Sequence, residues 1–90
     1  GLTLAAELRD PVSGRTMTVS TDLPGIQFYN GSKLSLRHWE GKDGVVYQAF
    51  NSLCLETQFF PDAPNQPSFP SIVLKAGETR TTHTMHRFSW

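Results

Sequence analysis

The sequence predicts an all-β chain, built as an antiparallel β-sandwich or as part of one, with few or no helices. Short stretches in which apolar and polar residues alternate recur along the chain, separated by Gly and Pro. No stretch of about ten residues carries the apolar stripe of an amphipathic helix. We therefore expect roughly six or seven short strands, in a single β domain over residues 1–90.

The first two predicted strands form an antiparallel hairpin. Residues 2–9 place leucine at every second position except one, which is typical of a half-buried strand. Residues 10–14 contain Pro and Gly and predict a turn. Residues 15–21 are rich in β-branched residues, with Met17 and Val19 on one face.

A short strand is predicted at residues 26–29, after a second Pro-Gly break. Gln27 and Tyr29 share one face of this strand because side chains alternate between faces. Residues 30–44 carry several glycines and charges, and predict a long surface connection with at most a short strand at 34–36.

The second half of the chain predicts more strands, separated by turns. Four prolines lock φ and remove backbone donors, so the loop that holds them is expected to be stiff. The elements expected are a strand at 45–50, a mostly buried strand at 53–60, the proline loop at 61–70, a short strand at 71–74, a turn at 75–78 and a strand at 79–88.

Glu56 is the residue in this half that needs an explanation, since it lies within an apolar run. A carboxylate in such a strand is solvated by a cavity, is paired, or has a raised pKa, and each condition suits an active site. The structural alternative is a carboxylate paired with an Arg or capped by backbone N–H groups. Cys54, in the same run, predicts a buried packing thiol.

Composition argues against several classes of function. Eight basic residues balance eight acidic ones and are scattered, so the sequence predicts no nucleic-acid or membrane partner. Cys54 is the single cysteine, which excludes an internal disulfide and favours a cytoplasmic protein. His83 and His86 are expected on opposite faces of a strand, so we predict no metal site.

Several motifs occur in an order that resembles the C-terminal part of the aldose 1-epimerases, the galactose mutarotase family. Each motif alone is a weak signal, whereas together they cover nearly all of the chain. They are VSTDLPGIQFY at 19–29, CLETQ at 54–58, PDAPNQP at 61–67, FP at 69–70 and LKAGET at 74–79.

The resemblance implies the last third of a large β-sandwich enzyme, part of the supersandwich of that family. Such an enzyme interconverts the α and β anomers of free hexoses such as galactose and glucose, without a cofactor. The resemblance makes Glu56 the general base and Gln27 a contact to the sugar. A monosaccharide is the implied substrate.

The chain also departs from the family pattern. The family places its general acid, a His, and further sugar-binding residues upstream, in a region that this chain does not contain. We therefore expect an incomplete chain that is inactive or very weak alone, and that associates with the missing N-terminal part or with itself. Residues 30–34, NGSKL, replace the usual TGNFL of the family and alter a loop near the expected pocket.

Two other interpretations remain open for the whole chain: a non-catalytic carbohydrate-binding module, or an inactive truncated fragment. Individual residues also have structural alternatives. We expect Asp62 and Asn65 to hydrogen-bond the backbone of their own loop rather than a sugar. His38 is expected to be solvated, and the aromatic residues Tyr29, Trp39 and Phe59 are either a stacking face for a sugar or part of the core.

Overall fold

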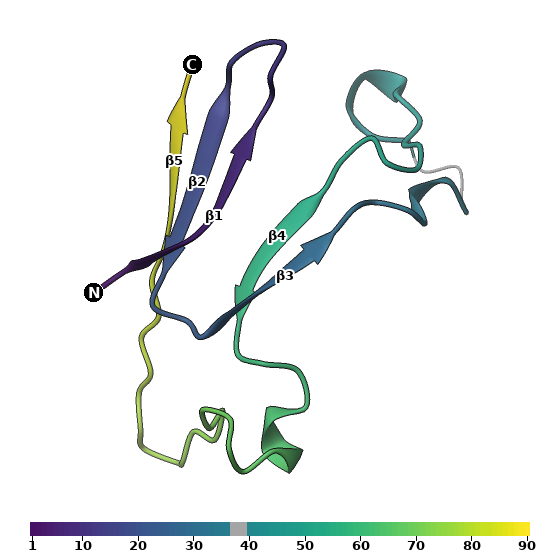
Figure 1. Cartoon of the computed structure of the whole chain (residues 1–90). Coiled ribbons are helices and arrows are strands. Elements are labelled where there is room, and N and C mark those ends of the chain that lie inside the picture. Colours follow the sequence, from purple (N-terminus) through teal and green to yellow (C-terminus); the bar gives the residue numbers. More distant parts are fainter. Residues whose placement is uncertain (37–39) are drawn as a thin grey trace. The chain divides into compact units, whose positions relative to one another are not determined.

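The structure, a computed structural model, describes residues 1–36 and 40–90 and is nearly all β (Figure 1). His38 and Trp39 lie outside the described residues. The all-β class and the antiparallel pairing are confirmed, whereas the sandwich and the single domain stay predictions. In the described ranges the strands are β1 Thr3–Arg9, β2 Thr16–Thr21, β3 Gly25–Tyr29, β4 Cys54–Gln58 and β5 Thr84–Ser89.

The chain divides into two compact units. One unit contains Gly1–Ile26 and Thr57–Trp90, and the other contains Gln27–Glu56. The first unit holds the three-stranded sheet β1-β2-β5, and the remaining strands β3 and β4 pair in a separate two-stranded sheet. Because the boundary between the units falls within β3 and within β4, each unit contains part of this strand pair.

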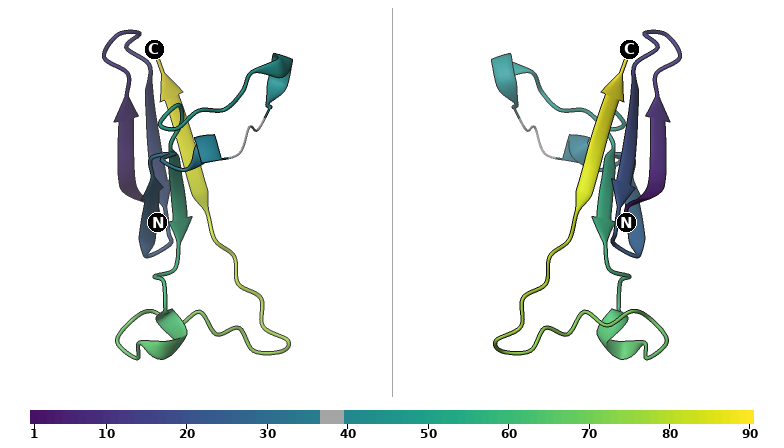
Figure 2. Two further views of the ribbon diagram at one scale, coloured as in Figure 1. Left: turned by 90° about the vertical axis from the view of Figure 1, so that its right-hand side faces the viewer. Right: turned by 90° about the vertical axis from the view of Figure 1, so that its left-hand side faces the viewer.

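β1 and β2 form the predicted antiparallel hairpin, and β5 adds to the free edge of β2 (Figure 2). The hairpin turn closes through Asp10 N–H, which donates to the Arg15 carbonyl at 2.9 Å. The Asp10 carboxylate accepts hydrogen bonds from the Ser13 hydroxyl at 2.6 Å and from the N–H groups of Val12 and Ser13. The bond from the Ser13 hydroxyl is the main reason why the pKa of Asp10 is lowered.

A β-bulge interrupts β1 between Leu4 and Ala6. Leu4 pairs with Ser20 and Ala6 pairs with Val19, so Ala5 is the extra residue of the bulge. The expectation that the alternating positions of residues 2–9 share one face is therefore wrong for Leu4. A one-residue shift in register moves a side chain to the other face of the sheet.

Burial of apolar side chains is limited in this chain. Val19 is fully buried on the central strand β2, and Ala63 is 6% exposed. The predicted half-buried first strand is not found, because β1 is exposed at every position except Ala6. Phe88 on β5 is also 62% exposed, so the described residues of the first unit leave much of the apolar surface of their sheet uncovered.

Residues 34–36, for which the sequence allows at most a short strand, do not form one, and the strand predicted at residues 45–50 is not found. Leu34–Leu36 is a single turn of 3₁₀-helix. In 45–50, the one ladder contact described is an isolated bridge between Val46 and Glu40. Phe50 has a φ of 65° and its N–H donates to the Gly31 carbonyl at 3.1 Å, so turns replace the extended backbone.

The short strand predicted at 71–74 is also absent from the described structure. The Arg80 guanidinium donates to the carbonyls of Ile72 at 3.0 Å and Val73 at 2.9 Å. A side chain thus satisfies the acceptors that a neighbouring strand would otherwise use. The last strand, predicted from residue 79, begins at Thr84, because its partner β2 ends at Thr21, which pairs with Thr84.

Candidate active site

Glu56 lies on the exposed face of β4. Along this strand Cys54 and Glu56 are exposed, whereas Leu55 and Thr57 are half-buried. The Thr57 hydroxyl lies 2.8 Å from the Thr84 hydroxyl on β5. Consecutive side chains of a strand point to opposite faces, so Glu56 and Thr57 lie on opposite faces of β4. The strand was predicted correctly, but the expected buried carboxylate and buried thiol are wrong, because Glu56 and Cys54 are both exposed.

The Glu56 carboxylate has no hydrogen-bond or salt-bridge partner among residues 1–36 and 40–90. The structural alternative for this residue was pairing with an Arg or capping by backbone N–H groups. The described residues show neither arrangement. The Glu56 side chain is exposed.

Gln27 is exposed on β3, the strand that neighbours β4. Its side-chain Nε2 donates to the Phe28 carbonyl at 3.1 Å. This local bond orients the amide and leaves its Oε1 without a described partner. The amide oxygen can therefore accept a hydrogen bond from a hydroxyl group.

Gln27 and Glu56 are the middle residues of two paired strands of five residues each. The two strands run in opposite directions (Figure 1). Five-residue antiparallel strands that pair along their whole length set their middle residues opposite one another, with Cβ atoms about 5 Å apart on one face. A Cβ built at Gly25 would lie 3.4 Å from the Gln58 carbonyl oxygen, and one built at Gly31 would lie 2.6 Å from the Ser52 carbonyl oxygen. Both contacts fit a register in which Gln27 lies opposite Glu56, and we infer this register.

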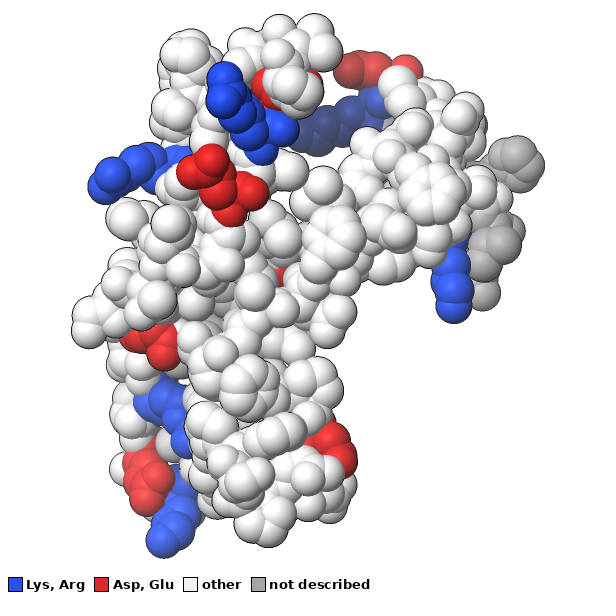
Figure 3. All heavy atoms as spheres, in the orientation of Figure 1, with Lys and Arg blue, Asp and Glu red and all other residues white. Residues whose placement is uncertain are grey.

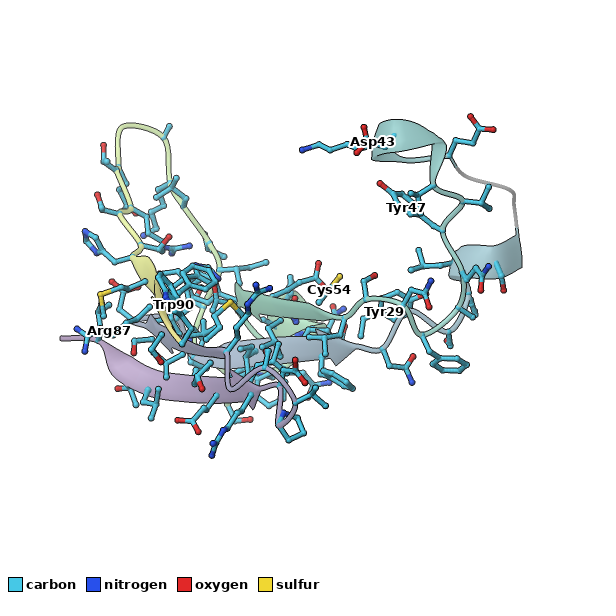
Figure 4. All side chains as sticks on the ribbon, turned by 90° about the horizontal axis from the view of Figure 1, so that it is seen from above. Tyr29, Asp43, Tyr47, Cys54, Arg87 and Trp90 are labelled. Carbon is cyan, nitrogen blue, oxygen red and sulfur yellow. The ribbon has the colours of Figure 1, made fainter. Side chains whose placement is uncertain are left out.

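Residues at the end of this strand pair extend the same face. The same register places Tyr29, the last residue of β3, opposite Cys54, the first residue of β4. Figure 4 labels both residues on the paired ends of the two strands. Tyr29 is half-buried, and Lys33 N–H donates to its hydroxyl oxygen at 3.1 Å.

The polar side chains of the proline loop bind one another, whereas the sequence predicted bonds to the loop backbone. Asn65 Nδ2 donates to Asp62 Oδ1 at 2.6 Å, and Gln66 Nε2 donates to Asp62 Oδ2 at 3.0 Å. The bond from Asn65 is the main reason why the pKa of Asp62 is lowered. The loop includes a single 3₁₀ turn, Ala63–Asn65, that begins with Pro near its N-terminus.

Other candidate residues have structural partners. Phe59 lies under Arg80, whose guanidinium carbon is 4.9 Å from the ring centroid, so Phe59 is not a free stacking face. His83 contacts Asp22, a pair that lies 61 residues apart and that no local sequence signal indicates. A cavity of about 640 Å³ contains neither Glu56 nor Gln27 in its lining, which is Ser13, Arg15, Thr16, Phe88, Ser89 and Trp90.

Within the described ranges, no group of three or more His, Cys, Asp or Glu side chains could hold a metal ion. No described helix has the length and apolarity needed to cross a bilayer. Acidic and basic side chains are interspersed on the face shown in Figure 3, as the scattered charges of the sequence predicted.

Comparison with known proteins assigns the family. The aldose 1-epimerase family model matches residues 1–87. Galactose mutarotases of Mus musculus and Homo sapiens are 45% and 44% identical over 84 residues, which is 93% of this chain and 24% of each relative. The aldose 1-epimerase of Escherichia coli K12 is 34% identical over 74 residues, or 80% of this chain and 21% of the relative. The chain thus spans about a quarter of the length of these relatives, and a match over nearly all of its residues shows that it belongs to the aldose 1-epimerase family.

Proposed function

We propose that this chain carries the general base of an aldose 1-epimerase that interconverts the α and β anomers of galactose and glucose. The observation that supports the proposal most is the placement of Glu56 and Gln27. Both side chains are exposed, and each is the middle residue of one of two neighbouring antiparallel strands. The names of the relatives, galactose mutarotase and aldose 1-epimerase, point to the same reaction.

In the proposed reaction the Glu56 carboxylate accepts the proton of the anomeric hydroxyl, while an acid protonates the ring oxygen. The bond between C1 and the ring oxygen breaks and gives the open-chain aldehyde. Rotation about the C1–C2 bond presents the other face of the carbonyl, and ring closure returns both protons. The Gln27 amide oxygen accepts a hydrogen bond from a sugar hydroxyl and fixes the ring relative to the carboxylate.

The proposal assigns the general acid to a part of the family protein that this chain does not span. Glu56 alone supplies half of the proton transfer, and much of the binding surface is expected to come from the same missing part. The uncovered apolar side chains of the β1-β2-β5 sheet, such as Leu4 and Phe88, support association with that part. Without it, the same surface and the sheet edges favour self-association.

Polarimetry on freshly dissolved α-glucose or α-galactose tests the chain alone. We expect little or no acceleration of mutarotation, because the acid is lacking. Rapid exchange that is abolished by Glu56→Gln would show instead that the chain supplies its own acid. Sugar binding without exchange, unchanged by Glu56→Gln, would favour a carbohydrate-binding module.

A chimera tests the catalytic assignment directly. In it, these residues replace the matching quarter of the Mus musculus galactose mutarotase, to which they are 45% identical. We expect an active chimera in which Glu56→Gln lowers kcat by about 10²- to 10⁴-fold, the usual contribution of a general base. Glu7→Gln is the matched control, since Glu7 is another exposed strand carboxylate. An active chimera that keeps its kcat after Glu56→Gln would refute the proposal.

A further inference from the structure

We propose that Tyr29 is a further sugar-positioning residue, which donates a hydrogen bond to the C4 hydroxyl of the hexose. Galactose and glucose differ only in the orientation of that hydroxyl, so the contact would determine preference between them. The inference rests on the proposed function, because it takes Glu56 as the group that faces the anomeric centre.

The strand pair places Tyr29 and Glu56 at a separation that one sugar ring can bridge. Tyr29 follows Gln27 by two residues, so both side chains lie on one face of β3. In the register inferred for β3 and β4, Glu56 lies opposite Gln27 and is therefore the diagonal neighbour of Tyr29. Diagonal neighbours in a sheet are about 7 to 8 Å apart, which is within reach of an aromatic side chain. C1 and C4 lie on opposite sides of a pyranose ring. A ring bound across this diagonal with its anomeric carbon, C1, at Glu56 therefore presents C4 to Tyr29.

The hydrogen bonding of Tyr29 leaves its own proton available. Lys33 N–H donates to the phenolic oxygen at 3.1 Å, so the oxygen serves as an acceptor in that bond. Among residues 1–36 and 40–90, no group accepts a hydrogen bond from the phenolic proton. A phenol can accept and donate at the same time, so Tyr29 can donate to a sugar hydroxyl without losing the Lys33 bond.

The loop after β3 holds the ring in place. The Gly31 carbonyl accepts hydrogen bonds from Leu34 N–H at 3.2 Å and from Phe50 N–H at 3.1 Å. Ser32 N–H donates to the Asn30 side chain at 3.1 Å. These bonds fix residues 30–34, the segment where this sequence differs from the usual family loop, and so fix the Lys33 N–H that positions the phenol. A positioned donor loses less entropy on binding than a mobile one.

The test uses the chimera described above with the variant Tyr29→Phe, which keeps the ring and removes the hydroxyl. We expect KM for glucose to rise roughly five- to tenfold, as for the loss of one hydrogen bond, with kcat within about twofold. The sharper comparison uses 4-deoxyglucose, which lacks the partner hydroxyl. Tyr29→Phe should leave KM for 4-deoxyglucose unchanged, whereas a merely structural role would raise KM for both sugars. Tyr47→Phe is the matched control, since Tyr47 is another tyrosine of the same unit and is 46% exposed.

The outcomes separate this inference from the proposed function. A chimera that responds to Glu56→Gln but not to Tyr29→Phe overturns the role of Tyr29 alone. A chimera that ignores Glu56→Gln overturns the proposed function and this inference with it. Should this chimera not fold, the same variants can be tested in a chimera with the Escherichia coli aldose 1-epimerase, to which the chain is 34% identical. An unchanged KM for glucose after Tyr29→Phe in that chimera, with a response to Glu56→Gln, would overturn the inference.

Discussion

Asp22 and His83 are 61 residues apart in the sequence and form a reciprocal pair in the structure. His83 Nδ1 lies 3.0 Å from Asp22 Oδ2, and His83 N–H donates to Asp22 Oδ1 at 2.9 Å. Asp22 N–H in turn donates to the His83 carbonyl at 3.2 Å. The pair therefore extends the β2-β5 ladder by one residue beyond Thr21 and Thr84 and holds the start of the last strand.

This pair predicts a loss of stability in acid. The pKa of Asp22 is lowered, chiefly by the hydrogen bond from His83 N–H and then by the bond from the His83 side chain. A carboxyl group with a lowered folded-state pKa contributes stability above its unfolded value of about 3.9, and the contribution is lost as pH falls through the folded value. Thermal melts should be recorded from about pH 7 to pH 2 for the native chain and for Asp22→Asn. At neutral pH the variant should have the lower melting temperature, and the difference between the two melting temperatures should shrink as the pH falls. Asp43→Asn is the control, since Asp43 is an exposed residue of the 3₁₀ turn Lys42–Gly44. An acid dependence that Asp22→Asn leaves unchanged would contradict this account.

Gly31→Ala is expected to destabilise the loop beside Tyr29. Gly31 has a φ of 74°, and a Cβ built there would lie 2.6 Å from the Ser52 carbonyl oxygen. Strain at such a position costs about 1 to 3 kcal/mol, and the close contact adds to it. Gly44→Ala is the matched control, since Gly44 has a φ of 71° but nothing lies within 4 Å of its built Cβ. Chemical denaturation should show that Gly31→Ala lowers the free energy of unfolding more than Gly44→Ala does. Equal losses in the two variants would show that the contact with the Ser52 carbonyl oxygen is unimportant.

Arg80→Lys is expected to loosen the segment around residues 71–80. A lysine ammonium cannot reproduce the two parallel N–H donors that bind the Ile72 and Val73 carbonyls. The loss of these bonds and of the contact with the Phe59 ring should cost about 1 to 2 kcal/mol. Limited proteolysis should cut this segment faster in Arg80→Lys than in the native chain. Arg9→Lys, on the exposed strand β1, is the control, and its segment should be cut at the rate of the native chain. Equal cutting rates in all three would show that Arg80 does not hold the segment.

Cys54 is expected to react readily with thiol reagents in the folded chain. Its side chain is exposed and lies on the same face of β4 as Glu56. A colorimetric disulfide reagent should therefore titrate one thiol per chain without denaturant. A bulky adduct at Cys54 should also reduce sugar binding at the proposed site, whereas Cys54→Ser should abolish labelling and retain binding. A thiol that reacts only after denaturation would contradict the exposed placement.

The alternation of apolar residues and the turn chemistry predicted most strands correctly. The hairpin of β1 and β2 has a strong local signal, because Asp10 and Gly14 satisfy the turn within five residues. The predictions failed where a distant residue changes a local preference. Ile72 and Val73 have strand-forming side chains, but Arg80 occupies their carbonyl groups. The bulge at Ala5 is likewise a property of the pairing with β2 and has no signal in the alternation itself.

For the proposed site, the sequence determined which residue types are present and which strands carry them. Local backbone preferences and side-chain alternation depend on near neighbours, so they placed Gln27 on β3 and Glu56 on β4. Only the tertiary structure decided that these strands pair and that the carboxylate is exposed. Strand pairing and solvent exposure are set by contacts between segments far apart in the chain, and an apolar run does not specify which segment will cover it. For the same reason only the structure joined Asp22 to His83, which lies 61 residues away.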